Sequence, residues 1–433
     1  MKTMLISVGG AEAPVINSIK AHAPDKLIFF VSRGSRSQIS EKIMPAIFAD
    51  LKKMIDHEFV VSPDEQDIGE STGVLLSEVP KAMRKLGCDA VWPDIVDYTG
   101  GTKTMGAAVV WASSKFPCQF NYVGGTERSK NGLGVVVDGA ERHVTLQNPW
   151  DRLAYFEIND ALKLFDCGQY ANSAELFAAI EKKVTDERAK REFHVLQAIV
   201  EGYSQWDMFN HDKALSLFQK NMPRLKDISE SECFYLPKMK DFTERTDFNF
   251  KFLQDLKAGG KLSWFMIHDL LANALRRSVL EKKYEDATAR TYAAIEKIAK
   301  LQLQMKYKIS NARCRPDQIP DKLRTEYAAK YADSDGFLKF GSIASYELLL
   351  HLGDIYGQRF AELANVRVHM SERNNSILGH GICVIDREKF ELLFNDALKI
   401  LKIEVPDLPV FPKFMEDGKR MMEKIINNDN VED

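Results

Sequence analysis

The spacing of apolar residues divides the chain into two parts. Up to about residue 148, short apolar runs alternate with longer amphipathic stretches, which is the pattern of strands and helices in turn. Strands are predicted over residues 4–8, 27–32, 58–62, 90–96, 119–123, 134–137 and 143–147, and helices over residues 13–21, 38–54, 69–86 and 103–115. The first part is therefore an α/β region.

The predicted strands indicate how the sheet is built. Several are uninterrupted apolar runs, such as Leu27-Ile28-Phe29-Phe30-Val31, and such strands are usually buried on both faces of a parallel sheet. The repeated βα order then predicts a doubly wound, Rossmann-like domain over residues 1–148. The last two strands, separated by Asp138-Gly139, predict a terminal hairpin.

From Trp150 onward the strand pattern almost disappears, and helix follows helix to about residue 402. Segments 168–177 and 209–218 share small residues at similar positions, and 283–287 is similar to them in part. They suggest stacked helical hairpins, although their irregular period does not define a repeat. Residues 221–260 are polar and contain glycines, and Ala258-Gly259-Gly260 at their end predicts a hinge or a boundary. We therefore predict an all-α helical linker over residues 149–262 and a second all-α domain over residues 263–433.

Composition narrows the class of protein. Of the 433 residues, 45% are hydrophobic and 28% charged, which is ordinary for a soluble globular protein. No apolar run reaches the roughly 18 residues that span a bilayer, and the N-terminus lacks a secretory signal pattern, so no membrane association is expected. Six scattered cysteines without a Cys-x-x-Cys pair argue against a zinc site and predict a reducing, cytoplasmic setting. A net charge of −3 argues against stable, nonspecific binding of long nucleic acid.

One segment carries candidate chemistry between a predicted strand and a predicted helix. It reads Asp97-Tyr98-Thr99-Gly100-Gly101-Thr102-Lys103-Thr104-Met105. Two adjacent glycines let a backbone approach a ligand closely, and the free N–H groups at a helix N-terminus favour phosphates. Three threonine hydroxyls and the Lys103 cation add further donors. The segment therefore predicts a phosphate cradle, and the alternative is an ordinary tight βα turn.

Three other loops follow predicted strands to the same sheet edge, where doubly wound sheets bind their ligands. They contain Ser7-Val8-Gly9-Gly10, Ser32-Arg33-Gly34-Ser35-Arg36 and Gly124-Gly125-Thr126, with Arg128 following the last. The loop after Val8 lacks the Gly-x-Gly-x-x-Gly spacing of a dinucleotide oxidoreductase, and the Gly100 segment lacks P-loop spacing. An edge rich in glycines, hydroxyls and cations suits a ligand with several phosphates and sugars. Arg33 and Arg36 also fit the alternative of solvated loop charges.

A second candidate site lies near the C-terminus, in Ser371-Glu372-Arg373-Asn374-Asn375-Ser376-Ile377-Leu378-Gly379-His380-Gly381. If this segment is helical, Arg373 and His380 lie on nearly the same face, about 10 Å apart along the axis. A two-fold dimer would bring in a second copy of the pair. Histidine can exchange a proton near neutral pH, arginine can hold a phosphate, and Asn374 is a neutral donor or acceptor beside them. These are the parts of a metal-free ribonuclease.

Two other interpretations of such a pair stay open. Arg188 and His194 have a similar spacing, but they lie in a charged stretch that predicts a solvated helix face. The segment around His380 also fits a helix C-terminus capped at Gly381, with the histidine stabilising the helix dipole. The polar neighbours of Arg373 and the flanking glycines favour the site. A glycine inside a helix costs about 1 kcal/mol and makes sense where another chain or a substrate comes close.

These motifs resemble those of known families. Residues 97–105 resemble the signature of CRISPR-associated Rossmann fold (CARF) sensor domains, and Arg373-Asn374 to His380 resembles the Arg-x(4–6)-His motif of HEPN ribonucleases. Residues 264–294, with Asp269-Leu270-Leu271-Ala272-Asn273-Ala274 and Tyr284-Glu285-Asp286-Ala287, look like the start of a HEPN region. The order CARF, helical linker, HEPN covers most of the chain, and the helical insert departs from the shortest members.

The resemblance implies an ancillary effector of type III CRISPR antiviral defence that works as a homodimer without a metal or another cofactor. Its CARF domain would bind a cyclic oligoadenylate messenger as allosteric activator, and its paired HEPN domains would then cut single-stranded RNA. Carried over by position, the messenger contacts are Gly9, Gly10, Ser32, Arg33, Thr99, Gly100, Gly101, Thr102, Lys103 and Met105, and the catalytic residues are Arg373, Asn374 and His380. The alternatives are a messenger-binding regulatory protein without nuclease activity, and a protein that slowly cleaves its own messenger.

Overall fold

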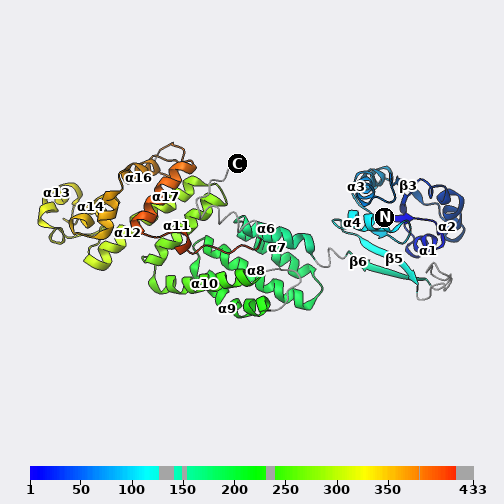
Figure 1. The fold of residues 1–433 in the computed structure, drawn as a ribbon, viewed down its shortest axis with the longest axis horizontal. Coiled ribbons are helices and arrows are strands. Elements are labelled where there is room, and N and C mark those ends of the chain that lie inside the picture. Colours follow the sequence, from blue (N-terminus) through cyan, green and yellow to red (C-terminus); the bar gives the residue numbers. More distant parts are fainter. Residues whose placement is uncertain (126–140, 149–153, 231–238, 380, 416–433) are drawn as a thin grey trace. The chain divides into compact units, whose positions relative to one another are not determined.

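The computed structural model describes residues 1–125, 141–148, 154–230, 239–379 and 381–415 (Figure 1). The chain divides into two compact units. The first comprises Met1–Phe156 with Lys182–Glu187, and the second comprises Glu157–Glu181 with Arg188–Asp433. Within the described ranges, none of the helices combines the length and apolarity that a membrane span requires.

The first unit is built on a mixed sheet in the order β3-β2-β1-β4-β5-β6. Its strands are β1 (Thr3–Val8), β2 (Lys26–Val31), β3 (Asp56–Val61), β4 (Ile95–Asp97), β5 (Gln119–Gly125) and β6 (Glu141–Gln147). The first five run parallel, and β6 pairs antiparallel with β5 at the edge. This sheet confirms the predicted Rossmann-like fold.

Helices cover both faces of the sheet. They are α1 (Ala13–His22), the π-helix η1 (Ile39–Ile43) that continues into α2 (Met44–Leu51), α3 (Ile68–Lys85) and α4 (Lys103–Ser113). Alternate strand residues enter two separate cores: Leu5 and Phe30 pack with α3 and α4, whereas Ile6 and Phe29 pack with α1, η1 and α2. Burial on both faces explains why these strands are apolar without interruption.

One strand is shorter than its apolar pattern predicts. The sequence predicts a strand over residues 90–96, but β4 begins only at Ile95. The preceding residues bend because Trp92 turns into the core, where its ring stacks on Phe116 at 4.2 Å between centroids and its Nε1 donates to Ser113 Oγ at 3.2 Å. Pro93 also has no N–H to give to a strand ladder. The predicted strand 134–137 and the turn at Asp138-Gly139 lie outside the described residues.

The elements from Tyr155 onward are helical, as predicted. The α-helices are α6 (Tyr155–Asp166), α7 (Tyr170–Lys183), α8 (Glu187–Asp207), α9 (His211–Glu230), α10 (Met239–Gly259), α11 (Trp264–Val279), α12 (Tyr284–Tyr307), α13 (Asp321–Tyr331), α14 (Ser342–His351), α15 (Ile355–Glu362), α16 (Val366–Asn374) and α17 (Arg387–Leu401). Two short 3-10 turns, η2 (Pro316–Gln318) and η3 (Val405–Asp407), complete the described elements. Helix α12 packs against α11, α14, α15, α16 and α17 and forms the centre of their shared core.

The three similar sequence segments share one structural role. Each begins in the turn of a helical hairpin or at its last residue, between α6 and α7, α8 and α9, or α11 and α12. Each turn has a residue in the left-handed region: Gly168 at φ +83°, Phe209 at φ +60° and Lys282 at φ +54°. The pattern therefore marks helical hairpins, which is consistent with its irregular period along the chain.

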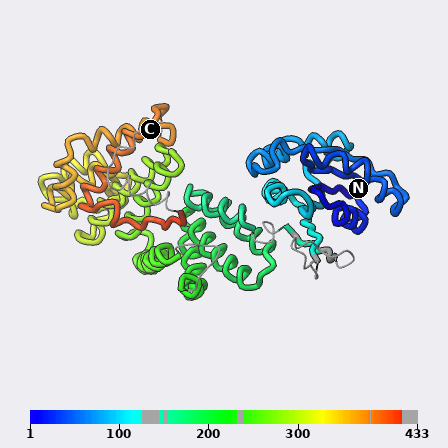
Figure 2. The backbone as a smooth tube through the Cα atoms, turned by 45° about the vertical axis from the view of Figure 1, so that its right-hand side comes forward, coloured from blue at the N-terminus to red at the C-terminus, as the bar shows by residue number. Residues whose placement is uncertain are grey.

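A C-terminal strap, residues 408–415, joins the last helices to the earlier ones within the second unit. The strap follows η3 and runs back along helices α6 to α10 (red against green in Figure 2). Arg245 of α10 donates to the carbonyl oxygens of Leu408 and Val410 at 3.0 and 2.9 Å. Phe414 stacks on Phe242 at 4.0 Å between centroids. The strap is thus an integral part of the helical core.

Candidate functional site

The strand order places the glycine loops at the centre of the first unit. Strands β1 and β4 are adjacent, and the chain leaves β1 toward β2 on one side and β4 toward β5 on the other. A doubly wound sheet opens a ligand crevice where its order reverses in this way, beyond the carboxyl ends of the two strands. The loops that follow β1 and β4 carry Gly9-Gly10 and Thr99–Lys103, so both predicted loops meet at this position.

Asp97, at the end of β4, anchors the glycine turn (residues 98–102) through its buried side chain. Its carboxylate is fully buried and accepts hydrogen bonds from the Thr99 N–H at 2.8 Å, from Asn121 Nδ2 at 2.5 Å and from the Ser18 hydroxyl. A buried carboxylate with three donors is well satisfied. Asp97 is therefore a scaffold for the turn, supported from α1 and β5.

The threonine hydroxyls also support the turn. Thr99 Oγ1 accepts from the Val123 N–H at 2.8 Å. Thr102 is the N-cap of α4: its Oγ1 accepts from the Met105 N–H at 3.1 Å and donates to the Glu65 carbonyl at 2.7 Å. The Met105 side chain is 1% exposed in the core beneath. The first N–H groups of α4, at Lys103 and Thr104, have no intrahelical partner and face the helix end, so the anion-binding feature of this turn is the helix N-terminus itself.

The glycines serve first to bring the two loops together. A Cβ on Gly100 would lie 2.3 Å from the Ser7 carbonyl oxygen, and a Cβ on Gly9 would lie 2.6 Å from the Gly101 nitrogen. Gly101 also has φ +82°, in the left-handed region. The sequence predicts that the glycines let the backbone approach a ligand. In the structure, they let the loop after β1 approach the loop after β4. Gly10 is different, since a Cβ there meets nothing within 4 Å.

This difference predicts a contrast between two neighbouring substitutions. Gly9→Ala is expected to destabilise the first unit by about 1–3 kcal/mol, because the Gly101 backbone must move to admit the methyl group. Gly10→Ala is the matched control and should unfold at the wild-type temperature. Differential scanning calorimetry of the full chain measures both, and equal unfolding temperatures for the two variants would refute the proposed loop packing.

Cationic side chains lie on separate loops at the carboxyl edge of the sheet. Arg33 and Lys103 are exposed, and Arg36 lies over the Phe59 ring at 4.9 Å from its centroid. The hydroxyl of Ser32, next to Arg33, forms a hydrogen bond of 3.1 Å with the hydroxyl of Ser35. Thr126 and Arg128 lie outside the described residues. The described part of the edge therefore combines the N-terminus of α4 with exposed cationic side chains, which suits an anionic ligand.

The second candidate segment is not helical throughout. Helix α16 ends at Asn374, so the predicted helical spacing between Arg373 and His380 is wrong. The glycines explain the ending: a Cβ on Gly379 would lie 2.4 Å from the Asn374 carbonyl oxygen, and one on Gly381 would lie 2.1 Å from that of Asn375. Residues 379 and 381 therefore lie directly against the backbone at the end of α16. The glycines allow this contact within the chain, rather than the contact with a partner or substrate that the sequence predicts. The helix C-terminus therefore falls at Asn374 rather than at Gly381, and His380 lies outside the described residues.

Arg373 is held by an aromatic ring rather than by a carboxylate. Its guanidinium carbon lies 4.7 Å from the centroid of Tyr292, a residue of α12. Nη1 donates to Asn374 Oδ1 at 3.2 Å, and Nε is buried without a hydrogen-bond partner in the described structure. Asn374 itself is exposed. A guanidinium that stacks on a ring keeps its charge available for a phosphate.

The other Arg/His pair of the sequence, Arg188 and His194, contacts glutamates on neighbouring parts of the helices. Arg188 Nε contacts Glu192 Oε1 at 2.9 Å, and His194 Nδ1 contacts Glu181 Oε1 at 3.2 Å. Both contacts lie on partly solvated helix faces, as the charged sequence predicts. Among the side chains described, His, Cys, Asp and Glu form no cluster of three that could hold a metal ion.

Sequence reasoning missed the residues that position the two sites. Asn121 was visible as one polar residue within an apolar strand, and such a residue is usually hydrogen-bonded in the core. Ser18 and Tyr292 gave no comparable signal, because their roles depend on helices that come together only in the fold. Glu285, which contacts the turn after Arg373, stands out in the sequence only as part of a family pattern.

Comparisons with known proteins agree with this architecture. The model of the Csm6 HEPN domain matches residues 256–404, and the model of the Csm6 6H domain matches residues 153–246. No curated protein sequence matches the chain. The solved structure of Enterococcus italicus Csm6, bound to cyclic hexa-2'-fluoro-hexa-dAMP, is similar with a TM-score of 0.53 and 12% identity, covering 99% of this chain and 99% of that chain. Can2 from Sulfobacillus thermosulfidooxidans, in complex with cyclic tetra-adenylate, covers 72% of this chain and 70% of that chain at 14% identity with a TM-score of 0.23, too low for a structural argument.

A Rossmann-like sensor sheet followed by a helical HEPN region defines the class of CARF–HEPN ancillary proteins. The chain belongs to this class in its type III CRISPR form, and both of its matched domain models are those of Csm6. The region predicted as a helical linker thus matches a defined helical domain. The predicted boundary between residues 262 and 263 stays a prediction.

Proposed function

We propose that the protein is a cyclic-oligoadenylate-activated, metal-independent endoribonuclease that cuts single-stranded RNA in type III CRISPR antiviral defence. The observation that carries the proposal is the match of the Csm6 HEPN model to residues 256–404, which contain Arg373, Asn374 and His380. The matched family supports RNA as the substrate. The chain's own residues supply a proton carrier, a phosphate-binding cation and a neutral polar group.

The chemistry follows from those three side chains. His380 would exchange the proton between the 2′-hydroxyl and the departing 5′-oxygen as the 2′-oxygen attacks phosphorus and the P–O5′ bond breaks. Arg373 would stabilise the negative charge that grows on the phosphoryl oxygens. Asn374, exposed beside it and bonded to Arg373 Nη1, would hold that guanidinium in place. Every step uses protons and atoms already present in the RNA and these side chains.

A second copy of the chain is the proposed partner at this site. Apolar side chains around the turn after α16 are strongly exposed: Ile377 is 63%, Leu378 53%, Ile382 90% and Val384 69% exposed. A patch of this kind next to a polar site is typical of an interaction surface. A two-fold axis through it would place the two Arg373 side chains on either side of one RNA strand.

The messenger is proposed to bind at the carboxyl edge of the sheet. Support comes from the α4 N-terminus at the strand-order reversal, from the cations Arg33 and Lys103, and from the cyclic adenylate analogue in the Enterococcus italicus structure. Gly100 and Gly101 would contribute backbone N–H groups, whereas the Thr99 N–H is already bonded to Asp97 and Thr99 would position the turn. We place this reaction in the cytoplasm, and the five described cysteines, all free thiols, support a reducing compartment.

Lys103 gives a direct test of messenger binding. Lys103→Ala is expected to raise the Kd for the cyclic oligoadenylate about 10-fold or more, because a charge-assisted bond to phosphate is lost. Lys81→Ala is the matched control, since it removes an equal charge from an exposed ion pair with Glu78 on α3. Isothermal titration with cyclic tetra-adenylate and cyclic hexa-adenylate measures the change. Equal affinity of both variants would contradict the site, and linear products in the mixture would favour a protein that cleaves its own messenger.

A further inference from the structure

One face of helix α12 holds both ends of the segment that begins at Arg373. Tyr292 lies under the Arg373 guanidinium, and Glu285 Oε1 accepts a hydrogen bond from the Leu378 N–H at 2.5 Å. The two α12 residues are seven apart, so they share a face and lie about 10 Å from each other along the axis. Helix α12 therefore contacts both Arg373 and Leu378 and positions the segment between them.

The contact from Glu285 is distinctive among the hydrogen bonds of this turn. Those of residues 375–379 otherwise run within residues 371–383 in the described structure; examples are Gly379 N–H to Ser376 O at 2.9 Å and Cys383 N–H to Asn375 O at 3.0 Å. These local bonds shape the turn without fixing it to another helix. Glu285 supplies a fixed point from α12, through a hydrogen bond to a charged acceptor at the protein surface.

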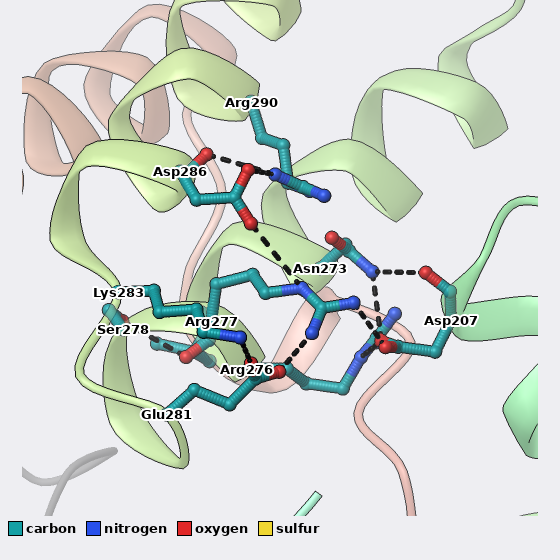
Figure 3. A network of polar contacts seen from close by, with 10 residues as sticks. Asp207, Asn273, Arg276, Arg277, Ser278, Glu281, Lys283, Asp286 and Arg290 are labelled. Atoms are coloured by element: carbon teal, nitrogen blue, oxygen red, sulfur yellow. Dashed lines mark hydrogen bonds and ion pairs between the residues drawn. The ribbon is translucent and has the colours of Figure 1, made fainter. Parts of the chain in front are cut away.

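The first turn of α12 is itself held firmly, by ion pairs (Figure 3). Asp286, next to Glu285, pairs with Arg290 one turn later and lies 3.7 Å from Arg277 Nε on α11. Arg277 also pairs with Asp207 at the end of α8, where both side chains are largely buried. Largely buried, mutually paired charges fix the relative position of the helices that carry them.

The ion pairs form a polar path that starts at Asp207, in the segment matched by the 6H model, and runs through Arg277 to Asp286. Glu285, which holds the turn after Arg373, is joined to this path through the helix backbone as the sequence neighbour of Asp286. We propose that Glu285 is a positioning residue for the nuclease site, and that this path makes its position depend on the end of α8. The inference rests on the proposed function and adds a means of regulating that same site.

Three full-length variants test the role of Glu285. In Glu285→Ala, kcat for RNA at saturating messenger is expected to fall about 10-fold or more, as for loss of a charged hydrogen bond, with KM and messenger affinity unchanged. Glu285→Gln keeps an acceptor oxygen and should retain intermediate activity. Glu296→Ala is the matched control: it removes the same charge from an exposed position on the same helix and should behave as wild type.

Hydrogen exchange gives a second measurement that does not need activity. In Glu285→Ala the amides of residues 375–379 should exchange faster, while those of α12 keep their protection. Unchanged exchange would overturn the anchor, and faster exchange without loss of kcat would overturn the positioning role. Lost protection throughout α12 would show a merely structural role and would also overturn it. A wild-type chain that cuts no RNA would instead overturn the proposed function, and that result is seen without any substitution.

Discussion

Replacing His380 or Arg373 by alanine is expected to lower RNA cleavage by a factor of about 1,000 or more while messenger binding persists. The histidine variant loses the proton carrier, and the arginine variant loses the positive charge that meets the transition state. Neither residue lies in the first unit, so binding of cyclic oligoadenylate should keep its wild-type Kd. Cleavage of a fluorescent single-stranded RNA and titration with the messenger measure the two properties on the same samples.

Arg367→Ala is the matched control for this experiment. Arg367 lies on the same helix as Arg373, is 58% exposed in its side chain and pairs with Glu347 at 2.9 Å. Its removal takes away one surface charge and one exposed ion pair, which is worth about 1 kcal/mol or less. Cleavage close to wild type is expected. If His380→Ala cuts RNA as fast as wild type does, the assignment of this segment as the nuclease site is wrong.

Phe411→Ala is expected to lower the free energy of unfolding of the second unit by about 3–5 kcal/mol. The Phe411 ring is 4% exposed and lies against three aromatic rings, with centroids 4.6 Å from Tyr203, 5.0 Å from Trp206 and 5.4 Å from Tyr170. The Arg276 guanidinium stacks on it at 3.7 Å. Truncation would leave a cavity where the strap meets helices α7, α8 and α11.

Urea unfolding followed by far-UV circular dichroism measures this loss, since helices dominate that signal. Phe248→Ala is a control of equal size: Phe248 is 47% exposed and contacts Arg245. Its removal is expected to cost about 1 kcal/mol or less. If Phe411→Ala changes stability no more than the control does, the strap is not part of the core.

Local patterns were sufficient to predict the elements of the fold. The apolar runs of β1 and β2 predicted a sheet covered on both faces, and the glycine turn before Lys103 predicted the start of α4. The strand order was not predictable, because the pairing of β1 with β4 joins residues about 90 positions apart and depends on packing across the whole sheet. The length of β4 was missed for a similar reason, since Trp92 leaves the strand to stack on a ring that lies further along the chain.

The candidate sites were predicted in part. The loop glycines lie at one edge of the sheet, as predicted, but Gly9 and Gly100 serve contact between two loops, and the ligand contacts at this edge stay a prediction. Near Arg373, the glycines predict an approaching chain or substrate, whereas in the structure Gly379 accommodates the end of α16. The supports from Tyr292 and Glu285 could not be seen, because α12 lies some 80 to 90 residues earlier in the sequence.

A cyclic oligoadenylate is proposed to switch on a metal-independent ribonuclease activity of this protein. The most direct measurement incubates the purified protein with a fluorescent single-stranded RNA in excess chelator, separately with cyclic tetra-adenylate, cyclic hexa-adenylate and no messenger. We predict rapid cleavage with one of the two rings and little without either. Absence of cleavage with both rings, or cleavage that appears only when a divalent metal is restored, would contradict this function.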